Sequence, residues 1–124
     1  MTNRRQRVVV LGASPKSSRY SNRAVRLLRQ NGHEVVPVNP GVPSIDGIPA
    51  AARLSAVRGH VDTLTVYVSA KRSSPLAEDI VQLRPGRVIF NPGAENPGLA
   101  EVLGREGIPA EAACTLVLLN TGQF

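Results

Sequence analysis

The 124-residue sequence is poor in cysteine, in aromatic residues and in long apolar runs, and each shortage excludes a class of protein. One cysteine, Cys114, cannot form an internal disulfide, and with two separated histidines it gives no zinc-ligand spacing. The longest stretch without a charged residue, 112–124, is shorter than the roughly 18 apolar residues that cross a bilayer. The basic start is followed by an apolar run too short for a secretory signal. We therefore expect a cytoplasmic protein with no disulfide, zinc site or membrane span.

The charge of the chain is predominantly positive and unevenly spread. Fifteen Lys and Arg residues against nine acids give a formal net charge of +6, and the excess lies in the first half. This asymmetry indicates that the first half of the chain binds an anionic partner, or it reflects a genome composition that favours arginine codons. Aromatic residues make up only 3% and lie far apart, so the stacking platform of single-strand nucleic-acid binders is missing. A nucleic-acid partner is therefore disfavoured.

Strand and helix patterns alternate along the chain, as is typical of an α/β domain with a parallel sheet. Short β-rich runs predict five strands at 7–11, 34–38, 62–68, 87–90 and 108–112. Helices are predicted at 21–31, 49–57, 73–84 and 97–106, with Ser21 or Asn22 capping the first and Ser73 or Ser74 the third. Residues 39–49 are expected to form a loop, and 115–119 suit a strand or a terminal helical turn. The whole chain thus forms one domain, with residues 1–6 a flexible basic segment.

The loop after the first predicted strand, residues 12–22, has the composition of a phosphate site. Gly12 lets a phosphate approach backbone amides, and the following helix points its positive end to the same place. Lys16 and Arg19 add cations, although an ordinary solvated loop has a similar composition. A G-x-G-x-x-G fingerprint and a P-loop are both absent. The second strand ends in neutral Asn39, which tolerates a phosphorylated ribose that a carboxylate would repel.

Four segments together resemble the small stand-alone CoA-binding proteins, whose fold is similar to the N-terminal domain of the succinyl-CoA synthetase alpha subunit. These segments are 10–16, 36–40, 66–68 and 91–96. The resemblance implies a Rossmann-like three-layer fold and coenzyme A, or an acyl-CoA, as ligand. It implies the following contact residues: Gly12, Ala13, Ser14, Lys16, Arg19, Tyr20 and Asn22 around the phosphates, Val38, Asn39 and Pro40 at the adenosine, Tyr67 and Val68 on one wall, and Asn91, Pro92 and Gly93 towards the pantetheine.

The sequence contains no recognisable catalytic constellation, whether Ser-His-Asp, Cys-His or paired carboxylates. His33 and His60 are expected at the surface. Cys114 falls near the ligand edge, where it is either a small buried residue or a partner for a mixed disulfide with the CoA thiol. We therefore expect a non-catalytic CoA or acyl-CoA binder, monomeric or homodimeric, with room for an unidentified protein partner. The alternatives are a nucleotide-dependent enzyme of the NAD(P) type and a charge-driven nucleic-acid binder.

Overall fold

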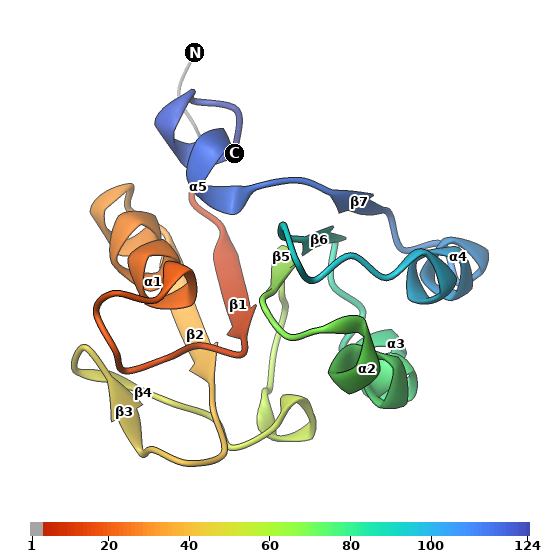
Figure 1. The fold of residues 1–124 in the computed structure, drawn as a ribbon, viewed down its shortest axis with the longest axis horizontal. Helices are drawn as coiled ribbons and strands as arrows, with labels where there is room; N and C mark the ends of the chain where they lie inside the picture. Colours follow the sequence, from red (N-terminus) through yellow and green to blue (C-terminus); the bar gives the residue numbers. More distant parts are fainter. Residues whose placement is uncertain (1–3) are drawn as a thin grey trace.

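A five-stranded parallel sheet in the order β2-β1-β5-β6-β7 forms the middle layer of the protein (Figure 1). This computed structural model describes residues 4–124. All neighbouring strands pair in parallel, which confirms the predicted α/β class and the Rossmann-like arrangement. The sheet strands are β1 (Arg7–Leu11), β2 (Glu34–Val38), β5 (Thr63–Val66), β6 (Arg87–Phe90) and β7 (Ala110–Ala112).

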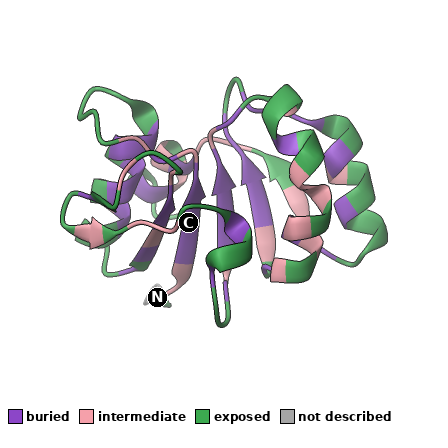
Figure 2. Ribbon diagram, turned by 90° about the horizontal axis from the view of Figure 1, so that it is seen from below, coloured by how far each residue is buried: buried purple, intermediate pink, exposed green. Residues whose placement is uncertain are grey.

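Helices cover both faces of this sheet, because its strands are apolar on both sides (Figure 2). On β1, Val8 and Val10 join a cluster with Leu28, whereas Val9 and Leu11 join a second cluster on the opposite face. One face is covered by α1 (Tyr20–Gln30) and α5 (Thr115–Asn120), and the other by α2 (Ala70–Ser73), α3 (Ala77–Leu83) and α4 (Pro97–Arg105). Among residues 4–124, none of the helices combines the length and apolar character needed to cross a membrane.

Two of the predicted connections between sheet strands are wrong in detail. The expected loop at 39–49 contains a small hairpin of β3 (Ser44–Ile45) and β4 (Ile48–Pro49), because buried Ile45 anchors it under α1. The helix expected at 49–57 is reduced to one 3-10 turn, η1 (Leu54–Ala56), since the backbone of Asn39 and Ala51 pairs beyond the end of β2. The hairpin therefore packs against β2 through β4, whereas η1 packs against α3.

The predicted helix starts also differ from the observed ones. Helix α1 begins at Tyr20, so Ser21 and Asn22 lie inside it, and no side chain caps its N-terminus. The third helix starts earlier than expected, as α2 and a 3-10 turn, η2 (Ser74–Leu76), that leads into α3. Asn96 does cap α4, accepting a hydrogen bond from the Leu99 amide at 3.1 Å. Residues 115–120, left open between strand and helix, form α5.

Near the amino-terminal edge of the sheet, residues from the two ends of the described chain contact each other. Residues 1–3 of the expected flexible segment lie outside the described residues, whereas Gln6 bonds to His33, Thr63 and the Phe124 carbonyl. The expectation of a surface position for His33 is wrong: the residue is only 8% exposed, and its ring centre lies 5.2 Å from that of Phe124. Burial, together with nearby Arg87, lowers the pKa of His33. His60 is exposed, as expected.

Candidate functional site

A cleft of three adjoining pockets runs along the carboxyl-terminal edge of the sheet, where ligands bind in folds of this class. The β2-side pocket, about 530 Å³, lies between the end of β2 and η1. The helix pocket, about 470 Å³, lies at the N-terminus of α1 and shares Gly12, Ser14, Val68 and Arg72 with the first. The α5-side pocket, about 300 Å³, continues it past Tyr20, Tyr67 and Pro92. One elongated ligand fits this arrangement better than a compact one.

The N-terminus of α1 opens into the helix pocket, and no side chain of residues 4–124 caps it. Arg19 occupies the N-cap position in the extended conformation usual there, its side chain makes no cap bond, and the first turn has no acidic residue. The first-turn amides of an 11-residue helix are thus left without intrahelical acceptors. Together with the helix dipole, these amides favour an anion bound from outside.

Three basic side chains surround this helix end. Lys16, Arg19 and Arg72 line the helix pocket, and none of them bonds or pairs with another residue in the range 4–124 through its side chain. No acidic residue lines the pocket within that range. The pocket therefore concentrates positive charge, with no carboxylate to neutralise it, at the point where the helix amides are free.

Gly12 lines both the β2-side pocket and the helix pocket, but its amide is already bonded within the protein. Its amide and that of Ala13 both donate to the Val38 carbonyl, at 3.3 and 3.2 Å, so they tie β1 to β2. A Cβ built on Gly12 would meet the Val68 side chain at 2.7 Å, and its φ of +85° is unfavourable for other residues. Gly12 is thus required for packing between loops, and the amides free for a ligand are those of α1.

Three asparagines among the predicted contact residues, Asn22, Asn39 and Asn91, hold the loops of the cleft together through their side chains. The buried Asn22 amide donates to the Ser14 carbonyl at 2.8 Å and to Asp46, and its oxygen accepts from Arg26. Asn39 donates to the Ala13 carbonyl at 2.8 Å and accepts from the Gly41 amide. These bonds join the phosphate loop to the loop after β2 and to the hairpin, and thereby preorganise the cleft.

Asn91 does the same at the other end of the cleft. Its amide donates to Thr65 at 2.7 Å and to the Val66 carbonyl, and its oxygen accepts from the Thr115 amide at 2.8 Å. Thr65 and Thr115 are bonded to each other at 2.8 Å. This buried network holds the start of α5 against the ends of β5 and β6, so the α5-side pocket has a fixed wall.

The β2-side pocket combines an apolar base with two cations. Val38, Asn39 and Pro40 border it as predicted, and Leu54 and Leu76 complete its apolar surface. Arg53 and Arg72 are its charged residues, and the side chain of Arg53 makes no hydrogen bond or ion pair with any described residue. A flat apolar group bearing an anion suits such a pocket.

Most of the predicted contact residues come together in this cleft. Asn22 and Gly93 do not line it, since Asn22 is buried beneath the loop and the Gly93 amide donates to Glu95. Sequence reasoning missed Arg53, Arg72 and Leu116, which all line it. Arg72 lies between the strand predicted at 62–68 and the helix predicted at 73–84, and its place in a strand-to-helix connection was the signal available for it.

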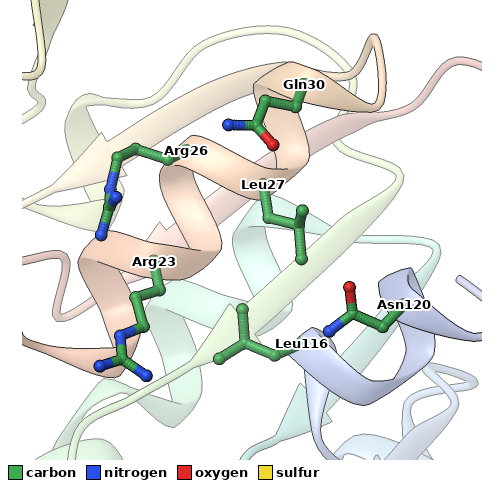
Figure 3. Close-up of a pocket in the computed structure, with 6 residues that line it drawn as sticks. All are labelled: Arg23, Arg26, Leu27, Gln30, Leu116 and Asn120. Atoms are coloured by element: carbon green, nitrogen blue, oxygen red, sulfur yellow. The ribbon is translucent and has the colours of Figure 1, made fainter.

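A separate depression of about 370 Å³ lies between α1 and α5, away from the strand ends (Figure 3). Leu27 of α1 and Leu116 of α5 lie across it, with Arg23 and Arg26 on its rim. Arg23 and Arg26 are both exposed to solvent. Because the Arg26 guanidinium is engaged by Asn22 and the Ser17 carbonyl, this depression offers less free charge than the cleft.

The protein has a Rossmann-like fold, with a cleft at the carboxyl-terminal ends of its strands that is lined by basic side chains. Residues 6–120 match the family described as CoA binding domain, and the chain belongs to this family. A Thermus thermophilus protein of known structure is 30% identical, with a TM-score of 0.89, over 97% of this chain and 91% of its own.

Two curated relatives are longer than this chain. The uncharacterised Bacillus subtilis protein YneT is 27% identical over 64% of this chain. An ADP-forming acetate–CoA ligase of Archaeoglobus fulgidus is 27% identical over 92% of this chain. The matches span only 58% of YneT and 18% of the ligase, so the chain corresponds to one part of that enzyme.

Proposed function

We propose that this protein is a non-catalytic binding protein for coenzyme A or an acyl-CoA. The observation that carries the proposal is the uncapped N-terminus of α1, which faces a pocket with Lys16, Arg19 and Arg72 and no acid within residues 4–124. Coenzyme A carries about four negative charges on its diphosphate and 3′-phosphate. Membership of the CoA binding domain family supports this ligand over other anions.

The three pockets accommodate the three parts of the ligand in order. The diphosphate lies in the helix pocket, where first-turn amides and cations donate to it. The adenosine lies in the β2-side pocket, where Arg53 is placed for the 3′-phosphate. The pantetheine runs past Tyr67 and Pro92 into the α5-side pocket. The neutral end of β2, Val38 to Pro40, leaves room for a phosphorylated ribose.

Isothermal titration with CoA, NAD and NADP tests this function directly. We expect binding of CoA and no response to either nicotinamide nucleotide. Lys16→Ala weakens CoA binding by about 1–3 kcal/mol because a charged hydrogen bond is lost, and it leaves the thermal midpoint unchanged because Lys16 is exposed. Lys71→Ala is the matched control, an exposed lysine that lines none of the three pockets. Binding of NAD or NADP in place of CoA would refute the proposal in favour of a nucleotide-dependent enzyme.

A further inference from the structure

The α5-side pocket differs from the rest of the cleft in having no charged side chain among the residues that line it. Its walls are formed by Tyr20, Tyr67, Asn91, Pro92, Cys114 and Leu116. The cations of the cleft, Lys16, Arg19, Arg53 and Arg72, all belong to the other two pockets. The cleft therefore changes from cationic to apolar along its length, in the direction that leads away from the phosphate site.

The polar atoms of this pocket are already used or hidden. The Asn91 amide is bonded to Thr65, Val66 and Thr115, so it offers nothing further to a ligand. The Tyr67 hydroxyl is buried without a hydrogen-bond partner among the described residues, and burial raises its pKa. A ligand group in this pocket therefore gains apolar contact and, apart from the Cys114 thiol, meets few donors or acceptors.

The entrance to this pocket is marked by an exposed aromatic ring. Tyr20 is 67% exposed although it lies at the junction of the helix and α5-side pockets, where the Arg23 guanidinium lies 5.4 Å from its ring centre. A ligand that extends from the helix pocket into the α5-side pocket would cover this exposed ring. Leu116 of α5 lines the same pocket and adds an aliphatic side chain to the two tyrosines.

We propose that the α5-side pocket is an acyl subsite and that the ligand of this protein is a short-chain acyl-CoA rather than free CoA. This inference rests on the proposed function and adds the class of thioester to it. A short alkyl chain, such as butyryl, buries its methylenes against Leu116, Pro92 and the tyrosine rings. Each buried methylene tightens binding roughly fourfold.

Titration with CoA, acetyl-CoA and butyryl-CoA, with a phosphine reductant present, tests the subsite. We expect butyryl-CoA to bind at least about tenfold more tightly than CoA, with acetyl-CoA between them. In Leu116→Asn this ratio falls to about one, whereas Val117→Asn, an exposed position on the same helix, keeps the wild-type ratio. Equal affinity of the wild-type protein for CoA and butyryl-CoA would overturn the subsite and leave the proposed function standing. Failure of all three compounds to bind would refute the proposed function itself.

Alkylation of Cys114 by iodoacetamide provides a second readout that needs no variant. Because Cys114 lines the pocket, saturating butyryl-CoA is expected to slow its alkylation more than saturating acetyl-CoA does. Neither compound has a free thiol that consumes the reagent. Equal rates of Cys114 alkylation with the two thioesters would mean that the acyl chain lies outside this pocket. A Leu116→Asn protein that still binds butyryl-CoA more tightly than CoA would mean the same. If Leu116→Asn does not fold, the alkylation rates of the wild-type protein alone test whether the acyl chain occupies this pocket.

Discussion

Replacing Arg19 by Asp is predicted to stabilise the protein and to weaken ligand binding in the same step. Arg19 occupies the N-cap of α1 with φ −76° and ψ 143°, a backbone conformation that Asp adopts readily. The Asp carboxylate accepts a hydrogen bond from a first-turn amide that has no partner in the wild-type helix. The same carboxylate then occupies the position where the ligand phosphate is proposed to bind.

The structure sets the expected size of both effects. A new N-cap contributes about 1 kcal/mol and the helix dipole about 0.3–1 kcal/mol, and Arg19 gives up no side-chain bond to another described residue. The melting temperature is expected to rise by roughly 5–8 °C. Loss of the arginine and gain of a carboxylate weaken CoA binding by at least about 1.5–3 kcal/mol, which is more than tenfold.

Two further variants separate capping from charge. Arg19→Asn supplies a neutral cap, so we expect most of the gain in melting temperature and a smaller loss of affinity than with Asp. Arg19→Ala supplies no cap and is expected to lose affinity without gaining stability. The measurements are thermal unfolding without ligand and isothermal titration with CoA. An Arg19→Asp protein that melts lower than wild type, or that binds CoA as tightly, would refute the assignment of this helix end as the phosphate site.

The remaining predictions concern the 3′-phosphate and the buried histidine. In isothermal titration, Arg53→Ala is expected to weaken binding of CoA about tenfold and to leave binding of dephospho-CoA unchanged. The control Arg58→Ala, outside the cleft, is expected to alter neither affinity. Equal losses of affinity for both ligands would show that Arg53 does not contact the 3′-phosphate. Because the pKa of His33 is lowered on folding, its contribution to stability is complete above its unfolded value of about 6.5 and is lost as the pH falls through its folded value. Urea unfolding between pH 7 and pH 5 is therefore expected to show a smaller fall in stability for His33→Gln than for wild type, and identical pH profiles would contradict this reasoning.

The strands were predictable because their signal is local. β1, β2 and β6 were expected at the residues where they occur, since each is a short apolar run closed by glycine, proline or asparagine. The helix starts were predicted less well, because Ser21 and Asn22 look like capping residues and yet are buried inside α1. Asn22 instead holds Ser14 and Asp46, which is a contact between segments that no local pattern contains.

The residues of the candidate site also divide into those that local motifs predict and those that depend on contacts between distant segments. The positions around Gly12, Asn39 and Asn91 were found from motifs that follow strand ends, and parallel strands bring such ends to one edge. Arg53 and Leu116 were missed because they follow no motif and reach the cleft through the path of η1 and α5. The buried position of His33 was also missed, since it depends on Phe124 packing against it from the far end of the chain.

From the amino-acid sequence alone, one could predict the α/β class of the fold, the sheet edge at which the cleft lies and the basic character of the first half. These properties depend on residue type and spacing along the chain, which local sterics and hydrophobic periodicity convert into strands and helices. Only the tertiary structure decided which polar groups are free for a ligand. The asparagine amides are consumed by bonds between loops, whereas the first turn of α1, Lys16, Arg19, Arg53 and Arg72 have no partner within residues 4–124. Hydrogen bonding and burial of such groups are set by contacts between distant segments, and these exist only once the sheet has assembled.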